Sequence, residues 1–248
     1  MSGLELFKRA LGQVLRHLDE ALAVSGLIWV GLAALEIVLA VMIDRSVVGE
    51  GASAQVPPNV AMLVMLVMVG MVVASCWVAV EWHRFALLGE RPTSAFPRFH
   101  GAETARYFFA SLKIGLLIVL FSSIAAGVVA NLLGQALIEQ LGVIIVFAVI
   151  ALPAFYAFYR VSPSLTAAAI GEKVRMAEAW RSTQGIGKPI FQTVILQMLL
   201  IMFVQLPSMV LGTGVVGTLY QLGAGWIVLM VSVSLLSTIY DLSRRPMT

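Results

Sequence analysis

The sequence predicts an all-α integral membrane protein with six transmembrane helices. The chain has 248 residues, of which 60% are hydrophobic and only 12% are charged. Soluble domains have about 45–50% apolar and about 25% charged residues, so a water-soluble domain of this length could not bury so much apolar surface. The same hydrophobicity excludes a disordered chain, and the single cysteine, Cys76, excludes a disulfide-stabilised scaffold.

Six continuous apolar stretches have about the length that a helix needs to cross a bilayer, roughly 20 residues. A transmembrane β-barrel would instead show short segments of alternating hydropathy. The stretch over 141–158 is the shortest of the six. The predicted spans are 23–43, 60–80, 108–130, 141–158, 190–211 and 217–240.

Residues 1–22 predict an amphipathic helix before the first span. Ser2 and Glu5 have the spacing of a capping box at its start. The segment is too charged for a cleavable signal peptide, so we expect an interfacial helix on the lipid surface. The alternative is a helix that docks on a partner. The expected apolar face, at spacings of three and four, is Leu4, Phe7, Leu11, Val14, Leu15, Leu18 and Leu22.

The basic residues lie almost entirely on one side of the predicted spans. Of the 16 Lys and Arg residues, only Arg45 falls in a loop on the other side. Loops rich in Lys and Arg remain in the cytoplasm, and an even number of spans puts both termini on one side. We therefore expect 1–22 and 241–248 to be cytoplasmic and 23–240 to form the transmembrane domain.

The two long basic loops share the pattern A-x-x-G-E-(K/R), which starts at Ala86 and again, 82 positions later, at Ala168. At the same offset Arg106 aligns with Lys188, each just before the next span. This spacing predicts two repeated helical hairpins, and the first and last spans could form a third. A chance match within apolar sequence is the alternative.

Glu36 is the formally charged residue that lies clearly within a predicted span. A carboxylate at that depth costs about 2.5–3.5 kcal/mol, so it should face the interior, be protonated or find a partner. Candidate donors are Ser75, Gln197 and Tyr156. The functional interpretation is a proton or cation site, and the structural one is a hydrogen-bonded interior carboxyl.

Charged and aromatic side chains at span ends and in the basic loops are candidate contacts for lipid headgroups or a partner. Glu81, Trp82, His83 and Arg84 close the second span, where they could bind a phosphate headgroup or relay a proton. They could equally be snorkelling residues at a span end. Residues 173–185 predict a short basic amphipathic helix, and such segments attract anionic headgroups. The candidate set is Glu81, Trp82, His83, Arg84, Arg91, Arg160, Lys173, Trp180 and Arg181.

Motifs of common catalytic and cofactor sites are missing. The sequence has no phosphate-binding loop, no H-E-x-x-H and no G-x-S-x-G. His17, His83 and His100 are not spaced as a metal site. We therefore predict a protein that is not an enzyme, with no metal, no cofactor and no nucleic-acid partner.

The ends of two spans and the segment that follows the second one carry a resemblance. One span ends in Trp82-His83-Arg84, and a later one ends in Tyr159-Arg160-Val161-Ser162-Pro163-Ser164, followed by Glu-Ala-Trp-Arg-Ser-Thr-Gln-Gly at 178–185. This layout resembles the YciC-type bacterial inner-membrane proteins of unknown function and the membrane domain fused to some glycerophosphodiester phosphodiesterases. The resemblance implies six helices, the bacterial inner membrane and no assigned catalytic residues. The phosphodiesterase chemistry belongs to a separate soluble domain and is not carried over.

The segment 178–185 is also similar to the E-A-A…G coupling loop of transport permeases that dock on an ATPase. The glycine is one residue late in this sequence, and the downstream I-x-L-P is missing.

The sequence therefore predicts an integral membrane scaffold or accessory factor that acts through its basic cytoplasmic loops. Its expected partners are the lipid bilayer, anionic lipid headgroups and another membrane protein. The alternative is a transporter or channel subunit that uses Glu36 and the helices kinked by Pro153 and Pro207. A water-filled cavity that reaches Glu36 would favour transport.

Overall fold

The computed structural model describes residues 1–48, 58–92, 98–212 and 214–245. Over these residues the chain is helical, with no β-strand, and five helices are long and apolar enough to cross a membrane. The predicted all-α class is confirmed. The elements are α1 (Gly3–Arg16), α2 (Leu18–Val48), α3 (Pro58–Leu88), α4 (Gly101–Ile145), the π-helix η1 (Val146–Ala151), α5 (Leu152–Val161), α6 (Pro163–Ala169), α7 (Met176–Ser182), the 3-10 turn η2 (Gln184–Ile186), α8 (Gly187–Gln205), α9 (Ser208–Leu211) and α10 (Val215–Ser243).

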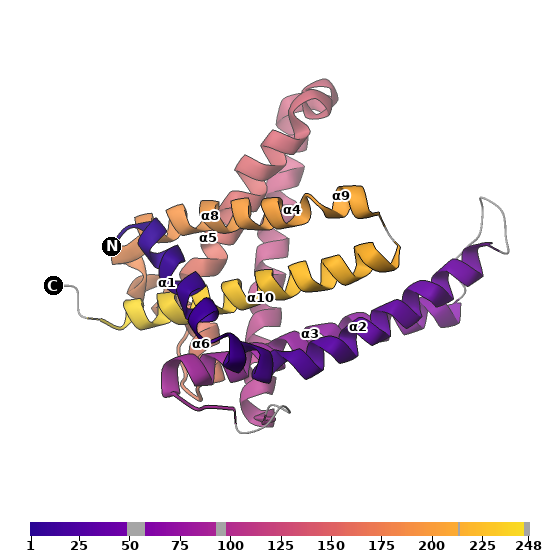
Figure 1. Cartoon of the computed structure of the whole chain (residues 1–248). Coiled ribbons are helices and arrows are strands. Elements are labelled where there is room, and N and C mark those ends of the chain that lie inside the picture. The colour runs from indigo at the N-terminus through magenta and orange to yellow at the C-terminus, as the bar shows by residue number, and fades with distance from the viewer. Residues whose placement is uncertain (49–57, 93–97, 213, 246–248) are drawn as a thin grey trace.

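Helix α10 is the centre of the protein, and α1, α2, α3, α6 and α8 pack against it (Figure 1). In α10, 61% of the membrane-length segment is buried inside the protein, against 28% or less in the other four such helices. The burial is concentrated near its end, where every residue from 233 to 240 is buried. The hydrophobic core therefore lies at one end of the molecule.

Both described chain ends lie at this buried end. Arg9 of α1 forms a 3.0 Å ion pair with Asp241 of α10. Figure 1 shows the N label beside α1 and α8, on the side where α10 ends. We call this part of the molecule the basic end; it comprises α1, α6, α7 and the adjoining ends of α3, α8 and α10.

Away from the basic end the helices expose large apolar side chains. Met209 and Val210 are 84% and 88% exposed, and Phe203 is 73% exposed. In water such a surface would be unfavourable, whereas lipid tails cover it without cost. The helices therefore rely on each other at the basic end and on lipid elsewhere.

Helix α1 begins as predicted, because the Ser2 hydroxyl accepts from the Glu5 amide and the Glu5 carboxylate accepts from the Ser2 amide. This capping box is confirmed. The predicted helix over 1–22 is interrupted at His17, however, and Leu18 starts α2.

One face of α1 is buried against α8 and α10 rather than against lipid. The Gly3 amide donates to Gln192 (2.9 Å), and the Thr193 hydroxyl donates to the Gly3 carbonyl (3.0 Å). Leu6 and Ala10 are fully buried in this contact. Of the predicted apolar face, Val14 is buried, Phe7 and Leu11 are half-buried, and Leu4, Leu15, Leu18 and Leu22 are exposed.

The two A-x-x-G-E-(K/R) segments form the same kind of turn. Gly89 and Gly171 both have positive φ (71° and 86°), the left-handed conformation that ends a helix and favours glycine. The helices before them differ, since α3 is continuous whereas the second copy is divided into η1, α5 and α6. The repeated hairpins are therefore not confirmed.

The predicted span over 141–158 is not confirmed as a single membrane-length helix. It falls on the end of α4, on the π-helix η1 and on part of α5, and the apolar helix there covers Ala148–Val161. Figure 1 shows α4 and the returning η1–α5 segment crossing the other long helices steeply instead of lying alongside them.

Candidate functional site

A buried arginine attaches α7 to α5 at the basic end. Arg160 is 7% exposed and donates to the Tyr156 hydroxyl (2.9 Å), the Thr183 hydroxyl (2.8 Å) and the Trp180 carbonyl (2.8 Å). Its guanidinium also stacks on the Trp180 ring at 4.4 Å. Among the described residues no carboxylate lies within ion-pair distance, so the charge is held by neutral acceptors and an aromatic face.

The helix that Arg160 holds, together with the residues just before it, exposes three basic side chains. The Glu178 carboxylate accepts from the Arg175 amide (3.1 Å) and so caps the first turn of α7. Lys173, Arg175 and Arg181 are exposed, and Trp180 remains 39% exposed while it stacks on Arg160. The structure thus brings Arg160, Trp180 and Arg181 of the predicted set together.

The ionisable side chains at the end of α3 are paired with neighbouring residues. Arg84 pairs with Glu90 at 2.6 Å, and Glu81 pairs with His100 at 2.6 Å. Arg84 also reaches the Ala169 carbonyl at 3.5 Å, at the edge of hydrogen-bond distance. This network fastens the end of α3 and the loop after it to His100, just before α4, and to the last residue of α6, and it leaves Arg84 without a free charge for a headgroup.

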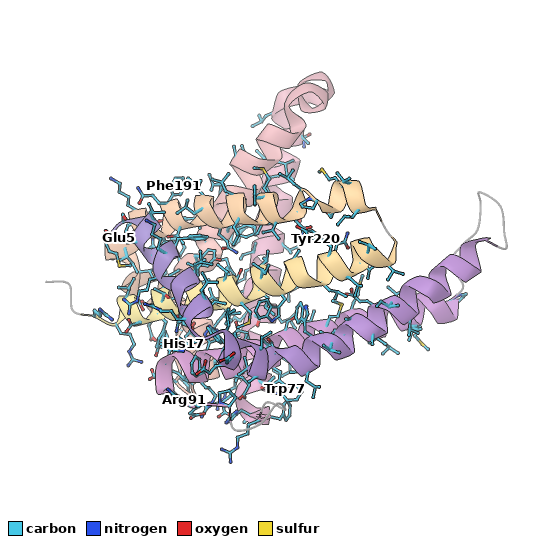
Figure 2. The ribbon with its side chains drawn as sticks, in the orientation of Figure 1. Glu5, His17, Trp77, Arg91, Phe191 and Tyr220 are labelled. Carbon is cyan, nitrogen blue, oxygen red and sulfur yellow. The ribbon has the colours of Figure 1, made fainter. Side chains whose placement is uncertain are left out.

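Two residues predicted at the membrane interface are buried in the core. Trp82 is fully buried and donates from Nε1 to Ser234 of α10 (3.3 Å). His83 is also fully buried, and its Nδ1 lies 2.8 Å from the Ser237 hydroxyl. Arg91 is exposed beyond α3, and Figure 2 shows it at the same end as His17.

Glu36 lies half-buried on α2, and no hydrogen bond or ion pair to it is found among the described residues. Two of its expected partners are engaged elsewhere, because Gln197 donates to Ser232 (2.9 Å) and the Tyr156 hydroxyl accepts from Arg160. Glu36 lines none of the cavities found between α5 and α8, between α8 and α10, beside η1 or at the basic end.

A cavity of about 420 Å³ at the basic end was not expected from the sequence. It lies where α1, the end of α3 and the end of α10 meet. Its charged lining residues come from opposite ends of the chain. Hydropathy does not indicate which distant segments of a sequence lie together in the fold. The charged residues that line it are Arg9, Arg16, His17, Asp241 and Arg245.

A second group of charges ties the loop after α6 to the end of α10. The Glu172 carboxylate accepts from the Tyr240 hydroxyl (2.8 Å) and pairs with Arg244. The Tyr240 hydrogen bond and the Arg244 charge hold the pKa of the Glu172 carboxyl below its usual range. Glu172 is therefore ionised at neutral pH and links the second loop to the C-terminal helix.

Within the described part of the chain, no three His, Cys, Asp or Glu side chains are grouped so that they could hold a metal ion. Comparisons with protein-family models, with curated proteins and with solved structures found no match to this chain, so its function has to be inferred from this geometry alone.

Proposed function

We propose that the protein is a non-enzymatic membrane scaffold or accessory factor that binds another membrane protein through α7. The docking surface comprises the exposed side chains of Lys173, Arg175, Trp180 and Arg181. The observation that carries the proposal is the attachment of α7 by the buried Arg160.

A buried guanidinium without a carboxylate is costly, and a loop that merely connects two spans does not need one. Here the charge fixes a seven-residue helix that is too short to be stable by itself. The result is a basic, partly aromatic surface that is already ordered, so a partner does not have to order a loop when it binds.

Charge complementarity indicates the chemistry of the partner. Lys173, Arg175 and Arg181 favour an acidic segment close to the membrane, and the exposed edge of Trp180 offers an apolar contact beside it. Anionic lipid headgroups are expected to surround the same basic residues.

The proposed topology has six crossings, with both termini in the cytoplasm of a bacterial inner membrane, as the resemblance to YciC-type proteins implies. The contact between α1 and the end of α10 supports an even number of crossings, because it puts both described chain ends on one side. Five helices have membrane length, so the η1–α5 segment with the end of α4 would supply the sixth crossing. The excess of Lys and Arg at this end supports a cytoplasmic location.

Site-specific photocross-linking in native membranes tests the docking surface. A cross-linking residue is placed at the exposed Gln184, and the adducts are identified by mass spectrometry. We expect one reproducible membrane-protein adduct that is lost when Lys173→Glu and Arg181→Glu are combined. The matched control, Lys8→Glu with Arg98→Glu, changes two other exposed basic residues and should retain the adduct. Loss in both variants, or no adduct in the unaltered protein, would exclude docking at α7.

The second candidate is a transporter or channel subunit. The π-helix η1 supports it, because irregular turns within apolar segments are frequent at functional sites. Proton flux into liposomes loaded with a pH-sensitive dye tests this function. If Glu36 carries protons, Glu36→Gln abolishes the flux and Glu178→Gln retains it. Absence of flux with the unaltered protein would count against proton transport.

A further inference from the structure

The cavity at the basic end has the size and lining of a small-molecule site. Its volume of about 420 Å³ falls within the range of about 300–1,000 Å³ that is typical of ligand pockets. Arg9, Arg16 and Gln13 line it from α1, and Asp241 and Arg245 line it from the end of α10 and the residues after it. The walls are thus drawn from both ends of the chain.

The charges in the lining are unbalanced. Asp241 accepts from Arg9 at 3.0 Å and from Arg245 at 2.6 Å, so one carboxylate is shared by two guanidinium groups. Arg16 makes a hydrogen bond to the Gly12 carbonyl and has no carboxylate partner among the described residues. Three arginines against one aspartate leave two positive charges around the cavity.

His17 also lines the cavity, and its Nδ1 lies 3.6 Å from a Glu20 carboxylate oxygen. The excess charge therefore belongs to the arginines, whose planar groups bind the oxygens of phosphate or carboxylate in pairs.

A buried chain of hydrogen bonds orients a neutral donor toward the same space. Trp82 Nε1 donates to the Ser234 hydroxyl, which in turn donates to Gln13 Oε1 at 3.1 Å. The Gln13 side-chain amide is therefore held by its oxygen, and no hydrogen bond of its Nε2 group to a described residue is found. This group is left to donate to a ligand, and Trp82 is a positioning residue behind it.

We propose that this cavity binds a phosphate monoester, with Arg9, Arg16, Arg245 and Gln13 as donors. A phosphate monoester carries close to two negative charges at neutral pH and offers three acceptor oxygens. Those charges match the excess in the cavity, and a single carboxylate would leave half of the excess unpaired. The proposal does not depend on docking at α7.

The phosphate could belong to a membrane lipid or to a soluble metabolite. The exposed leucines of α1, such as Leu4 and Leu15, place the cavity next to the lipid surface, where the headgroup of phosphatidic acid would reach it. A soluble phosphate ester would enter from the solvent side, where Arg9 and Arg245 are exposed.

Binding to the purified full-length protein tests the site. Isothermal titration in neutral detergent uses inorganic phosphate and glycerol 3-phosphate, and nanodiscs of phosphatidylcholine compare added phosphatidic acid with added phosphatidylglycerol. We expect binding of a phosphate monoester in at least one format, weakened about tenfold or more by Arg16→Gln and by Arg245→Gln. Arg98→Gln removes an exposed arginine outside the cavity and should change affinity less than about twofold.

The outcomes separate the sources and the alternatives. Binding of glycerol 3-phosphate in detergent indicates a soluble ligand, and binding of phosphatidic acid alone indicates a lipid; either supports the site. Equal binding of phosphatidylglycerol, equal weakening by Arg98→Gln, or no binding of any phosphate compound would overturn it. Arg16 is exposed and makes its one hydrogen bond within α1, so Arg16→Gln should unfold at the same temperature as the unaltered protein without ligand.

Discussion

Arg160 fixes the position of α7, which in larger elements is the role of a hydrophobic core. The helix has seven residues, of which Ala179 is the buried one, so apolar burial contributes little to its position. Three charge-assisted hydrogen bonds and the stack on Trp180 replace it.

Arg160→Lys is expected to release α7 because an ammonium group can neither stack as a plane nor reach three divergent acceptors. We expect a loss of about 2 kcal/mol in the local stability of residues 176–183. Hydrogen exchange measured by mass spectrometry would show faster exchange of their amides. Arg181→Lys makes the same chemical change at an exposed position and should leave exchange unchanged. Equal protection in both variants would contradict the role of Arg160.

Glu172 makes one contribution to stability depend on pH. Its pKa is lowered in the folded protein by Tyr240 and Arg244, so the ionised form stabilises the fold. That contribution is complete above the unfolded value of about 4.3 and is lost as the pH falls through the lower folded value. Since Glu172 is exposed, we expect no more than about 1 kcal/mol.

Thermal unfolding of the unaltered protein and of Glu172→Gln in detergent measures this effect. The difference in unfolding temperature should be present at pH 7 and should shrink below pH 4. Tyr240→Phe, which removes the hydroxyl donor, should show a smaller difference with the same pH trend. A difference that grows as the pH falls would have the wrong sign.

The burial and the partners of individual side chains were the hardest features to predict from the sequence. Trp82 and His83 follow an apolar run and precede Arg84, which is typical of a span end at the membrane interface. Their actual partners, Ser234 and Ser237, lie about 150 positions away on α10, so no local pattern indicates that they are buried. Arg160 could be predicted as a candidate, but two of its neutral acceptors, Trp180 and Thr183, could not, because the segment between α6 and α7 brings them to it.

At the scale of elements, the packing of α1 against α8 requires glycine at position 3, because no side chain fits there. A Cβ atom there would lie 2.3 Å from the Gln192 Cβ and 2.6 Å from the Pro189 carbonyl oxygen. Both atoms belong to α8, which is itself packed against α10 and α5.

Gly3→Ala should therefore displace α1 and lower the unfolding temperature by several degrees. Gly12→Ala is the matched control, since its Cβ would meet only the Arg16 guanidinium at 3.8 Å. That change is expected to be neutral or to stabilise α1 slightly, as alanine favours a helix over glycine. Circular dichroism during heating in detergent measures both. The same unfolding temperature for the two variants would show that α1 does not pack against α8 as described.

The long helices could be predicted from the sequence wherever a continuous apolar run is enough to define them. The spans that fall within α2, α3, α4, α8 and α10 follow from continuous apolar runs. Residues 141–158 are equally apolar, but the π-helix η1 and Pro153 divide them, and backbone geometry of this kind has no hydropathy signature. Amphipathicity predicted α1, but not that Leu6 and Ala10 would face a protein surface.

For the whole molecule, the proposed topology, with α1 in contact with the end of α10, predicts that both described chain ends lie on one side of a membrane. Cysteine labelling tests this in a Cys76→Ala background. Lys8→Cys, Arg181→Cys and Arg244→Cys are expected to react with an impermeant maleimide only after the cells are lysed. Gly214→Cys, at the other end of α10, should react in intact spheroplasts, and its Cβ would meet no atom within 4 Å. Reaction of the Arg181→Cys variant in intact spheroplasts would exclude the sixth crossing.

The central place of α10 has a consequence for how the chain is made. The helix that the others surround leaves the ribosome after the other described helices, whereas α1, which packs partly on α10, leaves it before them. The earlier helices can therefore reach their final packing only after α10 has been made, and until then they have only contacts among themselves, such as those of α2 with α3. Chains that end before residue 230 would lack the buried part of α10 on which the rest of the core packs, and they should be degraded rather than accumulate as stable fragments.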